Sequence, residues 1–514
     1  MATKGKSRRS GGRRRATTSP ATPARQPEYR RLKHPFAPQA VFNKDEVAGI
    51  HAAALRVLAE LGIRILLPEA RDILRRHGAR VDHEEMVFIG GDMVAEALRT
   101  APSSIRLRAA NPLREQTYEP GAFLTMAGAG CPNATDLRRG RRPGDLNSFV
   151  ETTKLVQRYD VLHMLGPTVE PQDVPVHLRH YAMLQGQLEY SDKPLFVYSR
   201  GSGQVNQSFE MIQIALDLSD SDFRNGVWAT SVINSNSPRL LDRPMAQGLM
   251  DFALHGQMSI ITPFCLAGAM APITVAGALT LQHAEALAAI VLVQMTRPGA
   301  PISYGGFSSN VDMKSGAPAF GTPEHVKMQL GTGQMARHIG LPWRSAAGAA
   351  SNLADAQGAT ETAHALWGAM MANATLTVHA AGWLEGGLSF GYEKFINDIE
   401  TLQTLAELCG ETNGSDDDIG FDAIAEVPPG GHFFATRHTM DRYSTAFYSP
   451  LVATRSSFGA WEEAGAKSAE ERARAIWERD LETYRRPASG LQVRDRLADY
   501  IARATDAGGA PPME

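Results

Sequence analysis

The sequence contains few cysteines, and their positions exclude several kinds of protein. Only three occur in 514 residues, Cys131, Cys265 and Cys409, and they form no CxxC motif. An odd number of widely separated cysteines argues against a disulfide scaffold and against a thiolate zinc site of the usual spacing. Such sparse use of cysteine is typical of a reducing compartment, so we predict a cytoplasmic protein.

A strong charge imbalance and a long apolar run are also missing. The formal net charge is -3, with 43% hydrophobic and 21% charged residues, as in an ordinary globular protein. The uncharged stretch 260–281 is interrupted by Pro263, Gly268, Pro272 and Gly277, and no unbroken run of about 18 strongly apolar residues occurs. We therefore expect neither a nucleic-acid partner nor a membrane-spanning segment.

The first 35 residues are predicted to form a disordered basic tail. Eight Lys and Arg residues precede Glu28, no acidic residue does, and Gly, Ser, Thr and Pro separate them. This composition cannot bury a core. No apolar segment follows that would make it a secretory signal. A transit peptide or a nucleic-acid-binding arm is the less favoured alternative.

Residues 43–120 are predicted to form a small α/β subdomain. Apolar residues at helical spacing predict a helix over 44–61 that Gly62 ends. The elements expected after it are a strand at 63–67, a helix from Pro68 to Gly78, a strand at 86–89 and a helix to Pro102.

From residue 121 to 410, short apolar strands alternate with longer amphipathic helices. Such alternation implies parallel strands joined by right-handed crossovers, and eight units close a (β/α)8 barrel. The predicted fold class is thus α/β: a TIM (β/α)8-type barrel with an N-terminal α/β subdomain and a mostly helical C-terminal extension. The expected strands are 123–127, 162–169, 195–199, 227–234, 258–266, 301–305, 342–347 and 376–380. The helices expected after them are 144–159, 177–190, 205–218, 244–256, 275–296, 323–339, 355–373 and 392–409.

Residues 411–510 are predicted to form the C-terminal extension, which we expect to act as a cap. An acidic loop (411–420) and an irregular piece rich in His and aromatic residues (431–448) precede a charged helix at 468–484, and a Pro/Gly tail follows.

Polar and aromatic residues occupy the C-terminal ends of the expected strands, where barrel enzymes place their active sites. Each also has a structural interpretation: an Asn after a strand is often a turn residue, and His379 could be a hydrogen-bonded core histidine. No set of histidines and cysteines has metal-ligand spacing, and no GxSxG elbow is present. The candidates are Asp136, Asn234, Tyr304, Phe307, His379, Trp383 and Glu385, with Tyr198, Arg200 and Phe264 at further strand ends.

From about His51 to Trp477 the chain resembles the trimethylamine methyltransferase family of corrinoid-dependent amine and betaine methyltransferases. The resemblance is carried by long, irregular strings: HAAALRVLAELGIRI, GDLNSFVETTKLVQ, NSNSPRLLD, ITPFCLAGAMAPITVAGAL, YGGFSSNVDMKSGAPAFGTPE, DAQGATE and HAAGWLEGGLSFGYEKFINDIE. It implies a methyltransferase that uses a small methylated amine and a corrinoid carried by a separate protein, with no cofactor bound by this chain itself. By resemblance, Asp136, Asn234 and His379 belong to the substrate site, and Tyr304, Phe307 and Trp383 would enclose the ammonium.

The sequence departs from this family at one point. The founding enzymes carry pyrrolysine in the loop after strand seven, and the corresponding stretch here, about 348–353, contains standard residues only. A tertiary amine is a poor methyl donor because it would leave as an amide anion, whereas a quaternary ammonium leaves as a neutral amine. The departure therefore favours a quaternary substrate such as glycine betaine, proline betaine or carnitine. The mechanism that the resemblance implies is an in-line displacement, which needs alignment and no general base.

Several functional alternatives remain open at this point. The substrate could be trimethylamine itself, the acceptor could be tetrahydrofolate without a carrier protein, or the barrel could bind an amine without catalysis. The sequence also leaves a homo-oligomer open.

Overall fold

The structure is a computed structural model that describes residues 28–513. Within them the chain divides into two compact units, one formed by residues 28–410 with 450–513 and the other by Glu411–Ser449. Residues 1–27 of the predicted basic tail lie outside the described residues. Residues 28–35, which were also predicted to be disordered, are in contact with the barrel: Lys33 bridges Ala122, and the backbone amide of His34 donates to Gly121 O (3.0 Å).

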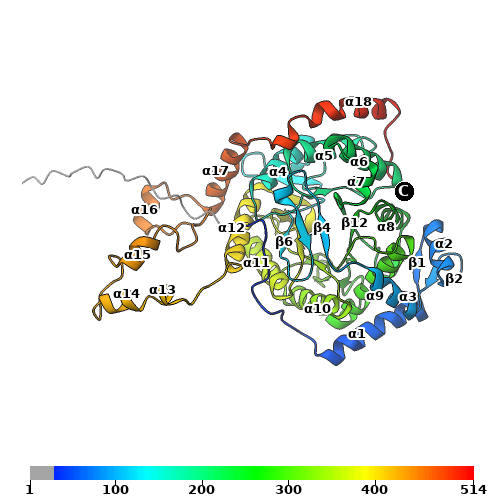
Figure 1. Ribbon diagram of the computed structural model, residues 1–514, viewed down its shortest axis with the longest axis horizontal. Helices are drawn as coiled ribbons and strands as arrows, with labels where there is room; N and C mark the ends of the chain where they lie inside the picture. The colour runs from blue at the N-terminus through cyan, green and yellow to red at the C-terminus, as the bar shows by residue number, and fades with distance from the viewer. Residues whose placement is uncertain (1–27, 514) are drawn as a thin grey trace, which may run out of the picture. The chain divides into compact units, whose positions relative to one another are not determined.

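Seven parallel strands form the sheet at the centre of the large unit (Figure 1). Nearly all their residues are buried, including several Ser and Thr residues and Arg344, because helices cover the outside and side chains fill the inside. In spatial order the strands are β6 (Leu124–Thr125), β18 (Leu376–Val378), β17 (Trp343–Ala346), β14 (Ile302–Gly305), β12 (Met258–Ile261), β10 (Ala229–Ile233) and β9 (Leu195–Phe196).

Residues 162–165 close the barrel between its two edge strands. The amide of His163 donates to Thr125 O (2.9 Å) beside β6, and the amide of Leu165 donates to Pro194 O (3.0 Å) beside β9. The expected strand over 162–169 is not formed as a regular ladder; it is reduced to isolated bridges such as Met126 with Met164. Gly166 and Pro167 follow these residues, and proline cannot donate to a ladder.

A ring of helices surrounds the barrel, and their ends agree closely with the sequence pattern (Figure 1). Side-chain caps explain this: Asp242, Thr274, Thr322 and Asp355 each accept a hydrogen bond from the first turn of the helix that follows. The helices are α4 (Leu146–Arg158), α5 (Arg179–Tyr190), α6 (Ser202–Leu216), α7 (Asp220–Arg224), α8 (Arg243–His255), α9 (Val275–Thr296), α10 (Pro323–Ile339), α11 (Ala356–Met371) and α12 (Tyr392–Leu408).

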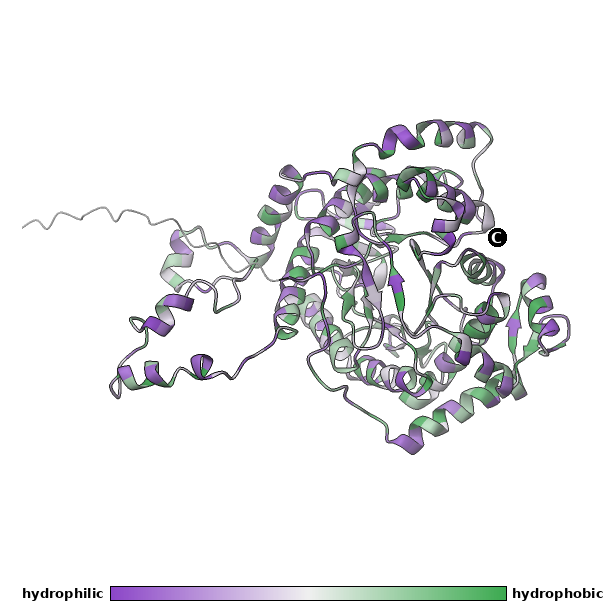
Figure 2. Cartoon of the chain, viewed as in Figure 1, coloured by the Kyte–Doolittle hydropathy of each residue, from purple (hydrophilic) through white to green (hydrophobic). Residues whose placement is uncertain are grey.

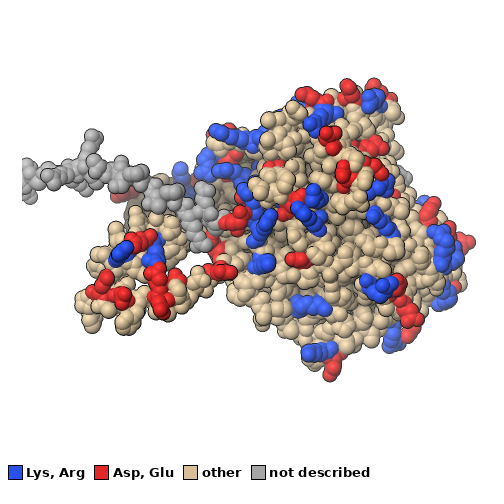
Figure 3. Space-filling view, viewed as in Figure 1, with Lys and Arg blue, Asp and Glu red and all other residues tan. Residues whose placement is uncertain are grey.

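Helix α9 is long and apolar enough to cross a membrane, by length and composition only. Within the structure, however, 78% of its most apolar window is buried, as in the core helix of a globular domain. Other outer helices alternate hydrophobic and hydrophilic residues (Figure 2), and basic and acidic side chains are interspersed on the barrel face seen in Figure 3.

The N-terminal subdomain packs on the barrel through α9 and shares a sheet with a barrel loop. Its sheet has the order β11-β1-β3-β2, and β11 (Leu240–Leu241) comes from the segment after β10. The sequence predicted all its elements except β2 (Arg80–Asp82). The elements are α1 (Lys44–Arg56), a π-helical turn at Val57–Leu61, β1 (Ile63–Ile65), α2 (Pro68–Arg76), β3 (Met86–Phe88) and α3 (Gly91–Thr100).

Short strands that the sequence analysis did not predict cover the two ends of the barrel. Seven of them lie in the loops that follow barrel strands and form two small sheets, β19-β20-β7-β8 and β13-β15-β16. They are β7 (Asn133–Thr135), β8 (Arg142–Pro143), β13 (Leu266–Ala267), β15 (Ser309–Val311), β16 (Pro318–Ala319), β19 (Trp383–Leu384) and β20 (Ser389–Gly391), with β4 (Ile105–Leu107) and β5 (Gln116–Tyr118) as a separate hairpin.

The C-terminal residues of the large unit are helical, as predicted, with one difference. Helix α17 (Ala469–Glu482) packs on α12, where the indole of Trp477 donates to Glu393 (3.0 Å). The prediction of a Pro/Gly tail after α17 is wrong, because helix α18 (Val493–Asp506) forms there and packs on α5 and α6. Helix α16 (Phe458–Glu463) precedes them.

The small unit, Glu411–Ser449, contains three short helices: α13 (Asp416–Ile419), α14 (Phe421–Glu426) and α15 (Arg437–Arg442). The carboxylate of Asp417 pairs with Arg442, and its carbonyl contacts His438 Nε2 (3.1 Å). Parts of this unit that were predicted as loop or irregular are therefore helical, because Ser415 and Thr436 cap α13 and α15.

Candidate active site

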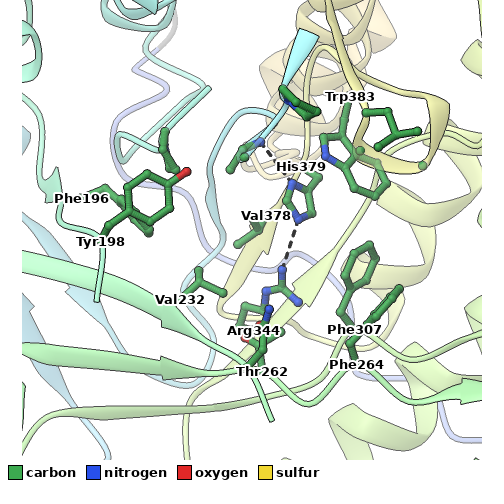
Figure 4. A pocket seen from close by; sticks show the side chains of 18 residues that line it. Phe196, Tyr198, Val232, Thr262, Phe264, Phe307, Arg344, Val378, His379 and Trp383 are labelled. Carbon is green, nitrogen blue, oxygen red and sulfur yellow. Dashed lines mark hydrogen bonds between the residues drawn. The ribbon is translucent and has the colours of Figure 1, made fainter. Parts of the chain in front are cut away.

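A cavity of about 380 Å³ lies at the C-terminal ends of the barrel strands (Figure 4). None of the described residues around it carries a carboxylate. Its lining is mostly apolar and aromatic, with a few polar groups, as is typical of a site for a small molecule. The lining residues include Phe196, Tyr198, Val232, Asn234, Thr262, Phe264, Phe307, Arg344, Val378, His379, Trp383 and the segment 386–388.

Three rings, those of Phe264, Phe307 and Trp383, form what we call the aromatic wall. The ring centroid of Phe307 lies 5.1 Å from that of Phe264 and 5.6 Å from that of Trp383. Glycine makes room for the indole: a Cβ on Gly348, at φ +104°, would lie 2.2 Å from Trp383 Cε3. Phe196 and Tyr198 lie on the opposite side of the cavity (Figure 4).

His379 follows β18 and has an unusual backbone conformation. Its φ of 59° is in the left-handed region, which is uncommon for a residue with a side chain and marks local strain. This conformation places its ring on Trp383, with centroids 4.5 Å apart and planes at 21°, and Nδ1 accepts from the amide of Ala129 (3.3 Å). Burial, and then the charge of Arg344, hold the pKa of His379 well below 6.5, so the ring is neutral at pH 7.

Arg344, on β17, is the cationic residue of the lining and is only 1% exposed. No acidic side chain among the described residues forms a salt bridge with it. Its Nη1 makes a long contact with Gly306 O (3.4 Å), its Nη2 lies 3.5 Å from His379 Nε2, and its Nε has no partner. Burial lowers the pKa of Arg344 to about 9, which leaves the guanidinium charged at pH 7.

Asn234 directly follows β10 and borders the cavity, and the loop after it is fixed by a buried carboxylate. Glu285, on α9, accepts hydrogen bonds from Ser235 Oγ (2.5 Å), Ser237 Oγ (2.6 Å) and the amide of Arg239 (2.7 Å). Because α9 is a rigid core helix, this carboxylate holds the loop, and with it Asn234, at the cavity.

The structure brings together four of the seven candidates, Asn234, Phe307, His379 and Trp383. Asp136 lies elsewhere, because its buried carboxylate pairs with Arg139 (2.7 Å) and Arg142 (2.8 Å).

The other two candidates that do not line the cavity are also engaged elsewhere. Glu385 pairs with Arg141 (2.9 Å) and accepts from Ser389 Oγ (2.7 Å). Tyr304 is fully buried, with its hydroxyl 3.0 Å from His283 Nδ1 on α9. Alternate residues of a strand face opposite sides, and the side chain of Tyr304 faces the helices outside the barrel.

Sequence reasoning missed Arg344 and Phe196. The signal for Arg344 was present, since a charged residue stands inside the predicted strand 342–347. Tyr198 and Phe264 were noted as strand-end residues but not selected. Among the described residues no group of three or more His, Cys, Asp or Glu side chains could hold a metal ion.

Comparison with known proteins identifies the family. The family model described as "Trimethylamine methyltransferase (MTTB)" matches residues 8–509. The chain belongs to the trimethylamine methyltransferase family. The predicted family and the predicted methyltransferase activity are thereby confirmed.

Two relatives and one solved structure are similar to this chain. A glycine betaine methyltransferase of Desulfitobacterium hafniense is 32% identical over 465 residues, covering 90% of this chain and 96% of that protein. An L-carnitine:corrinoid methyltransferase of Eubacterium limosum is 27% identical over 477 residues, covering 89% and 96%. The crystal structure of the Methanosarcina barkeri monomethylamine methyltransferase matches with a TM-score of 0.46 and 9% identity, covering 90% of this chain and 88% of that one.

Proposed function

We propose that this chain transfers a methyl group from a quaternary amine resembling glycine betaine to the Co(I) corrinoid of a separate carrier protein. The observation that carries the proposal is the cavity at the barrel mouth, where the described residues offer an aromatic wall and no carboxylate. Aromatic faces attract a quaternary ammonium by about 0.5–2 kcal/mol for each ring. The similarity to a glycine betaine methyltransferase and to an L-carnitine:corrinoid methyltransferase supports the substrate class and the acceptor.

The reaction moves one methyl group and no proton. The C–N bond breaks and leaves its electron pair on nitrogen, so the ammonium departs as a neutral tertiary amine. The acceptor substrate, Co(I), supplies the electron pair of the new bond to carbon and is formally oxidised to Co(III). A cavity whose described lining has no carboxylate, and in which His379 is neutral, suits this chemistry, since no step requires a general base.

The chain's contribution is alignment of the C–N bond toward the acceptor. In this proposal Phe307 and Trp383 hold the trimethylammonium group, while Asn234 and His379 contact the rest of the substrate. Positive charge leaves the nitrogen during the reaction, so an overly strong attraction for the cation would favour the ground state over the transition state. Moderate cation–π contacts with fixed polar contacts avoid that cost.

We further propose that the reaction takes place in the cytoplasm.

The test is methyl transfer to cob(I)alamin by the purified full-length protein under reducing, anaerobic conditions. Glycine betaine, proline betaine, carnitine and trimethylamine are supplied separately, and the absorption of the methylated product is followed. We expect methylation with at least one betaine and none without protein. Methylation with trimethylamine alone, or with no member of the panel, would contradict the proposed substrate class; methylation of tetrahydrofolate without any corrinoid would contradict the acceptor.

A further inference from the structure

The contact between Arg344 and His379 contains an unmatched pair of hydrogen-bond donors. The neutral ring of His379 has one N–H and one lone pair. Two donors approach it: the amide of Ala129 at Nδ1 (3.3 Å) and Arg344 Nη2 at Nε2 (3.5 Å). If Nδ1 accepts from Ala129, Nε2 carries the proton and points at the guanidinium as a second donor. An acceptor is missing between them.

Arg344 has the same deficit at its other nitrogens. Among the described residues its Nε is buried without a hydrogen-bond partner, and its remaining hydrogen bond is the long 3.4 Å approach to Gly306 O; the guanidinium also lies over the ring of Phe307, which is no hydrogen-bond acceptor of comparable strength. A buried guanidinium normally occurs with a carboxylate or with several short hydrogen bonds, because leaving such a charge unpaired is costly. A structural arginine on a barrel strand would be expected to find such partners within the protein.

We propose that Arg344 and His379 bind the carboxylate of the substrate, which makes the substrate a zwitterionic betaine and Arg344 its specificity-determining residue. The inference rests on the proposed function for the ammonium end of the ligand. A carboxylate oxygen placed between Arg344 Nη2 and His379 Nε2 would accept from both, and charge-assisted contacts of this kind are among the strongest hydrogen bonds in proteins.

The two ends of a short betaine fit the distances in the cavity. The guanidinium carbon of Arg344 lies 5.1 Å from the centroid of the Phe307 ring, which belongs to the aromatic wall. Cation and anion sites therefore adjoin, as the one-carbon spacer of glycine betaine requires. For a plain cation such as choline or trimethylammonium, the same proximity is unfavourable, since Arg344 repels it without compensation from a carboxylate.

Four ligands of nearly equal shape allow the contributions of the two ends of the substrate to the affinity to be measured separately. Glycine betaine carries both charges, choline carries only the cation, 3,3-dimethylbutyrate only the anion, and 3,3-dimethylbutanol neither. Calorimetric titration of the wild-type, full-length protein gives the contribution of each charge without any substitution. We expect replacement of the carboxylate by a hydroxyl to weaken binding about 10- to 100-fold. This loss should occur from glycine betaine to choline and also from 3,3-dimethylbutyrate to 3,3-dimethylbutanol.

The variant Arg344→Met should abolish this difference between carboxylate and hydroxyl ligands, and Arg344→Lys should retain part of it. Arg337→Met is the matched control. Arg337 is another arginine whose pKa is lowered by burial, but it lies on α10, donates to Ala372 O (2.9 Å) and does not line the cavity. Its loss should leave the difference intact. Thermal unfolding of each variant confirms that the protein tested is folded.

Equal affinity of the wild-type protein for glycine betaine and choline would overturn the inference, and so would an undiminished carboxylate preference in folded Arg344→Met. These outcomes are distinct from failure of the proposed function. Selective betaine binding without methyl transfer would retain the carboxylate site and refute the activity. Equally efficient methyl transfer from choline and from glycine betaine would retain the activity and refute the carboxylate site.

Discussion

Phe307 and Phe320 stack on each other, with ring centroids 5.1 Å apart and planes inclined at 17°, yet only Phe307 lines the cavity. The pair therefore separates the effect of an aromatic face on a ligand from the effect of an aromatic ring on packing. Phe320 is buried behind Phe307 and also contacts Trp383.

The first prediction concerns this pair. Phe307→Leu should weaken glycine betaine binding by about 2- to 30-fold, because one cation–π contact of about 0.5–2 kcal/mol is lost. Phe320→Leu should change the affinity less than about twofold while costing similar stability, on the order of 1 kcal/mol. Calorimetric titration and chemical unfolding of both variants check this. Equal losses of affinity in the two would show that packing, and not the ring face, determines binding.

The second prediction concerns His379. His379→Asn suits the left-handed backbone at this position, since Asn tolerates φ values near 59°. The variant loses the ring that stacks on Trp383 at 4.5 Å. We expect methyl transfer to fall at least about tenfold, while the free energy of unfolding changes by about 1 kcal/mol or less. A fully active variant would identify His379 as an ordinary core histidine.

The third prediction concerns Glu285, which we regard as a positioning residue. Glu285→Gln replaces one acceptor oxygen by an NH₂ group facing the hydroxyls or the amide that now donate to it. This should lower the free energy of unfolding by about 1–3 kcal/mol and raise KM for the betaine more than it lowers kcat, because Asn234 moves with the loop. Unchanged stability and KM would mean that the loop is held by other contacts.

The fourth prediction concerns the pH dependence of stability through His163. Its Nδ1 accepts from the amide of Thr125 (3.0 Å), its Nε2 contacts Tyr29 O (2.8 Å), and burial lowers its pKa from 6.5 to about 4. Between pH 6.5 and about 4 the unfolded chain takes up a proton that the folded chain does not. Stability is therefore fully present above pH 6.5 and falls with acidification by about 1.4 kcal/mol per pH unit from this group.

The matched variant for this measurement is His163→Gln, which cannot titrate. Its free energy of unfolding should depend less steeply on pH than that of the wild-type protein over the same range. Parallel curves for the two proteins would exclude His163 as a source of the acid sensitivity.

The barrel could be predicted from the sequence because its signals are local. Helices α9 and α10 have the predicted ends, Val275–Thr296 and Pro323–Ile339, since capping threonines precede them. The short strands at the two ends of the barrel were missed because two- and three-residue strands show no periodicity. Helix α18 was missed because Pro and Gly residues flank it on both sides. The site was predicted in part. The positions of His379 and Phe307 at strand ends indicated that both belong to the site. The role of Arg344 could not be predicted, because it depends on the absence of an acidic partner among the described residues around it. Which side chains pair across a barrel leaves no local signal in the sequence.

The most direct test of the central claim is a mass balance with glycine betaine labelled with ¹³C in its methyl groups. The full-length protein is incubated with the labelled betaine and cob(I)alamin, and nuclear magnetic resonance follows every labelled species. We predict one dimethylglycine and one methylcobalamin for each betaine consumed, and no consumption without cob(I)alamin. Loss of label from the betaine without an equal amount in methylcobalamin, or no loss at all, would contradict a quaternary-amine:corrinoid methyltransferase.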